Sequence, residues 1–249
     1  MTQLPAPSFT EMFPKYNNWW GQLKVVAQSP ANLAAAKIHA GTARYQAVEA
    51  KTTVPWYVIG LLHMRESNNN FHCWLHNGDP MFNHEGQPTR TVQVPPNRPP
   101  NPAVTWEEGA VDALQGFKLT QIKDWSAERI AYTAEAFNGW GYTLYRHIPS
   151  PYLFGGSSIQ QRGKYVRDRV WDSTEWDTQL GVLTTLKALM LIDPSIDLHP
   201  SMTVTRPDLP PIAPYPTPKA DHPSLPTLAP KPSIWVVILT AILSILRKK

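Results

Sequence analysis

Residues 56–67 read WYVIGLLHMRES, and their apolar spacing predicts a helix with one buried face. Four side chains of this segment recur at helical intervals and share that face: Ile59, Leu62, His63 and Glu66. Because the apolar residues must point inward, Glu66 ends a buried stripe instead of standing in water. A carboxyl group pressed against apolar neighbours resists ionisation, so its pKa rises. A carboxyl group that keeps its proton near neutral pH is what a general acid requires.

Glu66 also has a purely structural interpretation. Arg65, which precedes it in the sequence, or another basic residue would then pair with the carboxylate in an ion pair. Such a pair would hold Glu66 ionised and would leave it no proton to donate. The sequence alone leaves both interpretations open.

A second carboxylate follows thirteen residues later, at Asp79. It belongs to the segment Asn-Gly-Asp-Pro, residues 77–80, whose residue types are typical of a tight turn. An aspartate on a rigid loop after the helix could face the helix end across a cleft. Most glycosidases use two carboxyl groups that flank the glycosidic bond to be cleaved. The alternative is that Asp79 only caps its own turn.

Helical patterns on both sides of residues 56–67 predict a mainly α fold. Ser29 and Pro30 precede one pattern as a cap residue and a first-turn proline, and Thr105 with Glu108 forms a capping box before another. Ser126 can cap a third pattern, which Gly139 can end. The further helices expected are Ala31–Ala50, 106–118, 127–138 and Thr174–Leu191.

Six prolines between Pro88 and Pro102 predict an irregular loop inside the folded domain. The only candidate for β structure is a short ribbon around residues 90–94, because no pair of strands with alternating polarity stands out. We therefore expect a globular domain over residues 1–205.

The charge of the chain argues against a nucleic-acid partner. The formal net charge is +4 over 249 residues, but residues 206–249 hold six basic and two acidic residues. Residues 1–205 are therefore neutral, whereas a nucleic-acid binder needs a basic face on its folded part.

One cysteine, Cys73, excludes an internal disulfide framework and a four-cysteine zinc site. His72 and His76 are spaced as helical metal ligands, with Cys73 between them. However, Asn68-Asn69-Asn70 indicates that the helix has ended before them. We therefore expect no metal and no cofactor, and interpret this segment as a histidine-rich loop at the edge of a polar groove.

The segment 134–142, AEAFNGWGY, predicts a helix end followed by a glycine- and aromatic-rich turn. The amide of Asn138 can donate to and accept from the N-acetyl and hydroxyl groups of a sugar. Four aromatic residues nearby could form a stacking wall for that sugar: Trp140, Tyr142, Tyr145 and Tyr152. The alternative is an ordinary helix stop with core aromatic residues.

These motifs, in this order, resemble those of lysozyme-like enzymes. The helix ending in Arg-Glu-Ser resembles the catalytic helix of goose-type lysozymes and soluble lytic transglycosylases, and the spacing from Glu66 to Asp79 is similar to that of the goose type. AFNGWGY resembles the later Tyr-Asn-Gly segment of the transglycosylases, with Phe137 replacing the tyrosine. The stretch 150–172 resembles the closing segment of a phage and bacterial lysozyme family of muramidases. The resemblance covers residues 54–190.

The resemblance implies a lysozyme-like domain, of the phage endolysin type, that cleaves the glycan strands of peptidoglycan. Glu66 would be the acid that protonates the oxygen between N-acetylmuramic acid and N-acetylglucosamine. Ser67 and Asn138 would contact the sugar, with Tyr142 and Tyr152 also binding substrate, and Asp79 would position a water molecule. The enzyme would act as a monomer without a cofactor.

One departure from the goose-type pattern concerns the second acidic residue, which is replaced here by Arg90. This departure leaves open a lytic transglycosylase, in which the 6-hydroxyl of the sugar attacks and a 1,6-anhydro product forms. A rival from another class is a catalytically silent cell-wall-binding or virion structural protein that keeps the groove.

The C-terminal part of the sequence predicts a tethered membrane segment. Residues 206–232 hold ten prolines and predict a semi-rigid linker, residues 206–233. Within the last segment, 234–249, the apolar run Ile234–Leu246 precedes Arg247–Lys249. A run of thirteen residues is short for a bilayer span, so a weak or tilted attachment is expected. The alternative is that this run docks on a partner or has a hydrophobic coat role.

The expected location is the bacterial or host inner membrane, with the protein tail-anchored. The N-terminal residues contain no basic start followed by an apolar run, so the sequence predicts no signal peptide. We therefore expect the domain to start on the cytoplasmic face and to reach the cell wall when the membrane is breached.

Overall fold

The helix predicted over residues 56–67 is present in the computed structural model as α4, Trp56–Ser67. It starts after Pro55 and ends where Asn68 turns into the left-handed region at φ 55°. The structure describes residues 5–93, 95–101, 105–167 and 170–198, and these are mainly helical, as predicted. They belong to one compact unit, Met1–Pro207, while the predicted linker and Ile234–Leu246 lie outside the described residues.

Two further predicted helices are confirmed together with their caps. In α5, Trp106–Gly116, Thr105 and Glu108 form the expected reciprocal capping box. In α6, Ala127–Asn138, the Ser126 side chain accepts a hydrogen bond from the backbone of Arg129. These caps are local features, because the side chain and the backbone group that it satisfies lie within one turn.

The predicted helix Ala31–Ala50 is wrong as a single element. It is two helices, α2 (Gln28–Ala40) and α3 (Thr42–Thr52), which separate at Gly41. A Cβ atom at Gly41 would lie 2.6 Å from the ring of Tyr45, so glycine permits the close approach at this break. The break lets α2 pack against α8, Val182–Ile192, while α3 packs against α4 and α5.

The last helix begins at Val182, later than the predicted Thr174, because the residues before it make other contacts. Gly181 is extended and donates its backbone N–H to Gly155 O at 2.8 Å. A Cβ atom at Gly181 would lie 2.2 Å from Leu153 O, so this contact requires glycine. Contacts with the distant segment 153–155 thus set the residue at which α8 begins.

The predicted ribbon at residues 90–94 is also wrong. Thr91 is instead held in a loop by hydrogen bonds with Arg98. The strands of the described residues are β1 (Lys164–Arg167) and β2 (Val170–Asp172), which pair antiparallel as a hairpin. The remaining helical elements are α1 (Phe9–Gln22), η1 (Leu119–Gln121), η2 (Tyr142–Arg146) and α7 (Pro151–Phe154).

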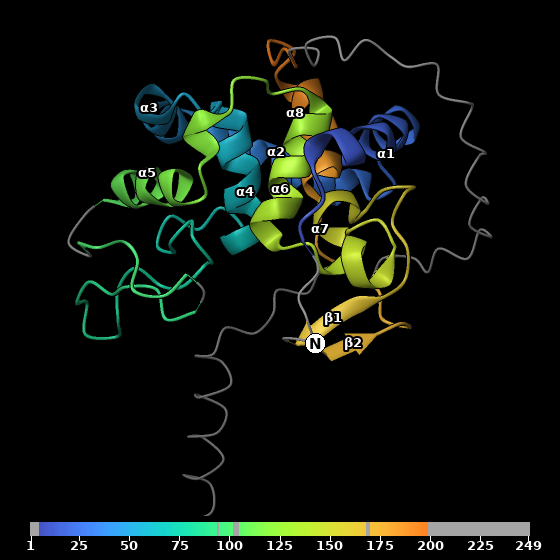
Figure 1. Ribbon diagram of the computed structural model, residues 1–249. Coiled ribbons are helices and arrows are strands. Elements are labelled where there is room, and N and C mark those ends of the chain that lie inside the picture. Colours follow the sequence, from blue (N-terminus) through green and yellow to red (C-terminus); the bar gives the residue numbers. More distant parts are fainter. Residues whose placement is uncertain (1–4, 94, 102–104, 168–169, 199–249) are drawn as a thin grey trace, which may run out of the picture. The chain divides into compact units, whose positions relative to one another are not determined.

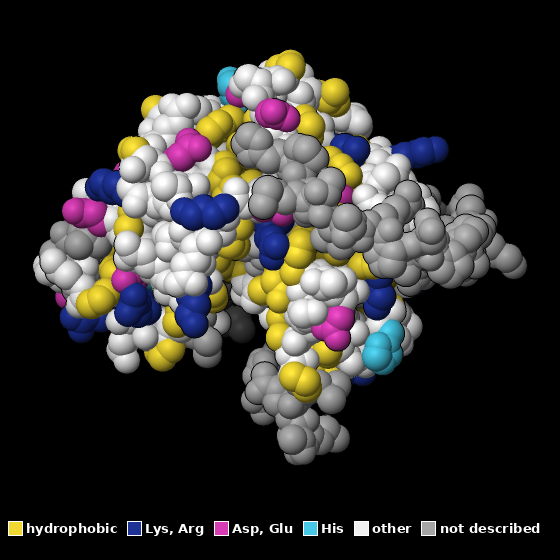
Figure 2. All heavy atoms as spheres, turned by 45° about the horizontal axis from the view of Figure 1, so that its top comes forward, with side chains coloured by type: hydrophobic (Ala, Val, Ile, Leu, Met, Phe, Trp, Pro, Cys, Tyr) yellow, Lys and Arg dark blue, Asp and Glu magenta, His cyan; other side chains and the backbone are white. Residues whose placement is uncertain are grey.

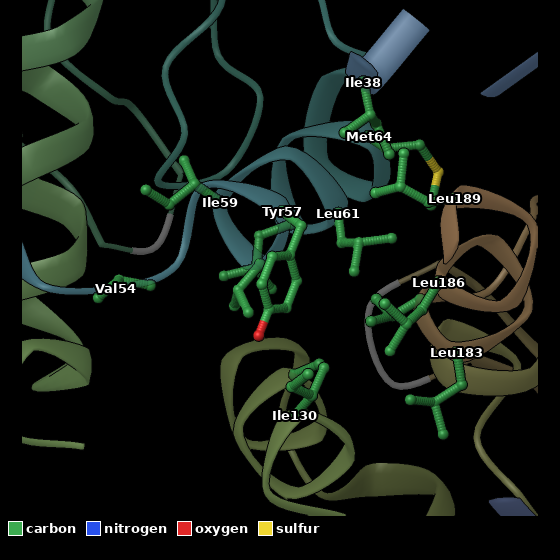
Figure 3. Close-up of a cluster of buried hydrophobic side chains, with 14 of the residues drawn as sticks. Ile38, Val54, Tyr57, Ile59, Leu61, Met64, Ile130, Leu183, Leu186 and Leu189 are labelled. Carbon is green, nitrogen blue, oxygen red and sulfur yellow. The ribbon is translucent and has the colours of Figure 1, made fainter. Parts of the chain in front are cut away.

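The core forms around α4, which contributes a continuous buried stretch from Tyr57 to Met64. Figure 3 shows Tyr57 and Leu61 of α4 pointing toward Ile130 of α6 and toward leucines of α8. Such burial on nearly all sides of one helix stabilises it through tertiary packing. None of the described helices is long and apolar enough to cross a bilayer.

The core places the end of α4 between two irregular regions. In Figure 1 the segment 68–101, which we call the loop lobe, lies to one side of that end, and the β1–β2 hairpin lies to the other. Contacts from both regions reach the last turn of α4, at Glu66 from the loop lobe and at Arg65 from the residues that hold the hairpin. The fold therefore surrounds the residue that the sequence singles out.

Candidate active site

Glu66 lies in the last turn of α4, where its carboxyl group is surrounded by protein on most sides while the residue stays partly accessible. Its Oε1 accepts a hydrogen bond of 2.7 Å from the hydroxyl of Tyr152 on α7. Desolvation raises the pKa of Glu66 to about 7, against the lowering effects of the Tyr152 hydrogen bond and of the Arg65 charge. The carboxyl group can thus hold a proton near neutral pH, as a general acid must.

The alternative of an ion pair between Arg65 and Glu66 is not what the structure contains. The Arg65 guanidinium donates to Leu180 O at 2.9 Å, and its Nη2 lies 3.9 Å from Asp177 Oδ2. Across the described ranges, no lysine or arginine forms an ion pair with Glu66. The burial of Glu66 is therefore not offset by a direct countercharge.

Asp79 lies on a loop that touches the end of α4. Its neighbour Gly78 has φ +77°, and a Cβ atom there would lie 2.3 Å from Glu66 O. Asp79 Oδ2 accepts hydrogen bonds from the Asn77 side chain at 3.0 Å and from the backbone of Val92 at 2.7 Å and Gln93 at 3.1 Å. Asp79 therefore organises the loop lobe as well as its own turn, close to the candidate acid.

Ser67 and Asn138 lie at helix ends. The Ser67 hydroxyl is 3.4 Å from His63 O and 3.5 Å from Asn70 O, so it donates to the backbone of its own segment. Asn138 is exposed at the end of α6 and is followed by Gly139 at φ +89°. The Asn138 amide is therefore accessible from solvent beside a glycine turn.

The predicted stacking wall is divided between the surface and the interior. Tyr145 is 46% exposed, whereas Tyr152 is 3% exposed and Tyr142 is 8% exposed. Tyr142 accepts a hydrogen bond from the backbone of Tyr165 on β1. Trp140 packs against Tyr132, with ring centroids 5.0 Å apart.

Tyr152 was predicted to lie on the exposed stacking wall, but it is buried, and its hydroxyl donates a hydrogen bond to Glu66. Burial and the neighbouring Glu66 raise the pKa of Tyr152 well above its usual value, so its hydroxyl remains a donor. The Glu66 and Tyr152 pair is separated by 86 residues in sequence, and no local pattern around either residue indicates it.

The histidine-rich segment has mainly structural partners. His76 Nε2 lies 2.8 Å from Asp112 Oδ2 on α5, and Arg98 also binds Asp112 through its guanidinium. Within the residues that the structure describes, no group of three or more His, Cys, Asp or Glu side chains could hold a metal ion. This cluster instead fastens the loop lobe to α5.

The surface of this unit is indented on one face. Figure 2 shows the surface indented between the left-hand part, which contains α5 and the loop lobe, and the lower right-hand part. Hydrophobic side chains are visible along the indentation, with Lys or Arg side chains at its edges.

The Tyr152→Phe substitution tests the hydrogen bond to Glu66. Tyr152 stabilises the ionised carboxylate, so its removal is expected to raise the pKa of Glu66 further. The measurement is a pH titration of the Glu66 side-chain carbon by NMR, with Tyr145→Phe as the control because that ring is exposed. An unchanged or lower pKa in Tyr152→Phe would contradict the assignment of the bond.

Comparison of the chain with protein-family models, with curated proteins and with solved structures gave no match in any of the three.

Proposed function

We propose that the protein is a peptidoglycan-degrading glycosidase, an N-acetylmuramidase of the endolysin type, with a lysozyme-like catalytic domain. The observation that carries the proposal is Glu66 itself. It stands at the end of a buried helix, is hydrogen-bonded by Tyr152, has a pKa raised to about 7 and lacks a direct ion pair among the described residues. Protonation of a glycosidic oxygen needs a carboxyl group in this state.

In the proposed reaction Glu66 donates its proton to the oxygen between N-acetylmuramic acid and N-acetylglucosamine. The bond from that oxygen to C1 of N-acetylmuramic acid breaks, and Asp79 would orient the water that adds to C1 and would accept its proton. Ser67 and Asn138 would contact the sugar. Support for Asp79 comes from the contact of its neighbour Gly78 with the Glu66 backbone, which brings the loop to the acid.

A lytic transglycosylase is the second candidate, and a specific observation favours it. Asp79 Oδ2 already accepts three hydrogen bonds within the loop lobe. Arg90, which replaces the second acid of the goose type, binds Pro100 O through its guanidinium. A site with few free carboxylates suits attack by the sugar's own 6-hydroxyl, because the Glu66 carboxylate formed in the first step can accept the proton of that hydroxyl and no second base is needed.

Product analysis tests the proposal directly. Purified peptidoglycan is digested with the protein, and the soluble fragments are analysed by mass spectrometry. Hydrolysis gives reducing N-acetylmuramic acid ends, whereas a transglycosylase gives 1,6-anhydro ends that are lighter by one water. The absence of any cleaved fragment between pH 4 and 8 would exclude both enzymes and favour the cell-wall-binding alternative.

The Asp79→Asn substitution separates the two enzymes kinetically. A hydrolase is expected to slow by about 10²-fold, since general base assistance is worth roughly that factor. A transglycosylase is expected to slow only modestly. The rate of solubilisation of labelled peptidoglycan is the measurement, and Asn77→Ala is the matched control because it removes one partner of Asp79 without removing its charge. A loss below threefold would contradict the hydrolase.

We also propose attachment to the inner membrane through Ile234–Leu246, which lies outside the described residues. Deletion of residues 234–249 is expected to move the protein to the soluble fraction and to leave its activity on purified cell walls intact. Cell fractionation followed by immunoblotting measures this shift. If the full chain is already wholly soluble in cells, the anchor is wrong.

A further inference from the structure

Arg65 is buried beside the candidate acid but is directed elsewhere. Only 6% of its side chain is exposed, and its guanidinium carbon lies 4.5 Å from the centre of the Tyr152 ring. The hydroxyl of that same ring binds Glu66. A cation and the candidate acid therefore share one neighbour, Tyr152, without forming an ion pair with each other.

Asp177 is the carboxylate that accompanies Arg65. Its side chain is 3% exposed, and its Oδ2 lies 3.9 Å from Arg65 Nη2. Asp177 is itself held in place, since Oδ1 lies 3.1 Å from Lys164 Nζ and accepts the backbone N–H of Gln179 at 2.9 Å. Its backbone oxygen accepts a bond of 2.6 Å from Gln160.

This arrangement connects the hairpin to the end of α4. Lys164 belongs to β1, Asp177 lies between β2 and α8, and Arg65 lies on α4. The buried Arg65 is satisfied only in part, because its Nε has no hydrogen-bond partner. An unsatisfied nitrogen on a buried guanidinium is energetically costly, so a further acceptor would stabilise it.

Glu66 is the other carboxyl group beside this guanidinium, since both contact Tyr152 and the Arg65 charge already lowers the pKa of Glu66. The charged and titratable groups that act on Glu66 are Arg65 on α4 and Tyr152 on α7, while Asp177 acts through Arg65. Asp79 on the loop lobe follows Gly78, which contacts the Glu66 backbone. Of these, only Arg65 is positively charged. A direct ion pair with Arg65 would keep Glu66 ionised and remove the proton that a general acid must donate.

We propose that Asp177 is a positioning residue that holds the Arg65 guanidinium against Leu180 and Tyr152, and so prevents a direct ion pair between Arg65 and Glu66. This inference rests on the acid role given to Glu66 in the proposed function. Asp177 has no direct contact with Glu66 and acts through Arg65 alone.

The Asp177→Asn substitution tests the proposal in the full chain. It keeps the shape and the acceptor oxygen for Gln179 but removes the charge that retains Arg65. Arg65 is then expected to turn to Glu66 and to lower the pH midpoint of Glu66 ionisation by about one pH unit or more, as an opposite charge at short range does. The midpoint is measured by NMR titration of the Glu66 side-chain carbon.

Three further variants make the result specific. The double variant Arg65→Met with Asp177→Asn is expected to bring the midpoint back to the wild-type value or above it, because the cation is gone. Asp177→Glu keeps the charge and is expected to stay close to wild type. Asp172→Asn, a matched acid in β2 that binds Thr174, is expected to have no effect.

The proposal is overturned if Asp177→Asn leaves the Glu66 midpoint unchanged or raises it, or if the double variant keeps the lowered value. If Asp177→Asn does not fold, as judged by circular dichroism, it is replaced by the double variant Lys164→Met with Asp177→Asn, which removes the lysine left unpaired by the loss of Asp177. The Glu66 midpoint of that variant must fall, and an unchanged midpoint overturns the role of Asp177. Because this readout needs no substrate, an inactive wild type would refute the proposed function without refuting the role of Asp177. With an active wild type, the alkaline limb of the rate profile must shift downward with the midpoint.

Discussion

The Glu66→Gln variant is expected to lose about 10²-fold or more of the rate of peptidoglycan cleavage, while keeping its fold. Glutamine matches the shape of glutamic acid but has no proton that it can transfer, and a positioned general acid is worth roughly 10²–10⁴-fold. The measurement is the release of soluble fragments from labelled peptidoglycan at pH 6, where the wild-type carboxyl group is largely protonated given its pKa of about 7. Activity like that of wild type would refute the catalytic assignment.

Glu85→Gln is the matched control for this experiment. Glu85 lies on the loop lobe with 70% of its side chain exposed, so the same chemical change there is expected to leave the rate unaltered. An equal loss in both variants would point to a general charge effect and not to acid catalysis.

The pH dependence of stability gives a second readout of the same substitution. Burial raises the pKa of Glu66 from 4.5 to about 7, so the folded state binds this proton more tightly than the unfolded state does. The protonated group therefore contributes stability below pH 4.5, and this contribution is lost as the pH rises to about 7. Relative to wild type, Glu66→Gln is expected to gain stability over this window, as measured by urea unfolding at pH 4 and pH 8.

The Trp74→Ala variant is expected to lower the free energy of unfolding by about 3–5 kcal/mol, as removal of a buried aromatic side chain does. Trp74 is fully buried, packs against Gly109 of α5 and donates its indole N–H to Thr89 O at 3.2 Å. It therefore joins the loop lobe to α5. Alanine would leave a cavity at this junction and also remove the hydrogen bond.

Urea-induced unfolding followed by circular dichroism measures the effect of Trp74→Ala. Val92→Ala in the same lobe is the control, because that side chain is 84% exposed and is expected to change the stability by less than about 0.5 kcal/mol. A difference below about 1 kcal/mol between the two variants would show that Trp74 is not the anchor of the loop lobe.

Local sequence signals determined the helices whose caps lie within one turn. Thr105 with Glu108 and Ser126 with the backbone of Arg129 satisfy helix ends with groups three residues away. The apolar stripe of α4 and the position of Glu66 at its end followed from helical periodicity in the same way. A further capping box, between Ser8 and Glu11 at the start of α1, was present in the sequence and could have identified that helix.

Other boundaries depended on contacts with distant parts of the chain. The break at Gly41 follows from the packing of Tyr45, and the late start of α8 follows from the approach of Gly181 to the backbone of Leu153. Each predicted helix extended across one of these glycines, and was therefore longer than the helix that the structure contains. These helix boundaries depend on how the helices pack against one another. The periodicity of one segment does not predict that packing.

For Glu66, the sequence predicted the position of the carboxyl group, whereas the tertiary structure decided whether it forms an ion pair. From the sequence it followed that a carboxyl group would end a buried helix face, but not whether Arg65 would neutralise it. The tertiary structure decided this, since Arg65 forms its ion pair with Asp177 and the Tyr152 hydroxyl donates a hydrogen bond to Glu66. Each pair is separated by more than 80 residues in the sequence. Hydrogen bonds and ion pairs between such distant residues depend on distances that only the folded chain sets, whereas spacing along a helix is set by the backbone of that helix alone.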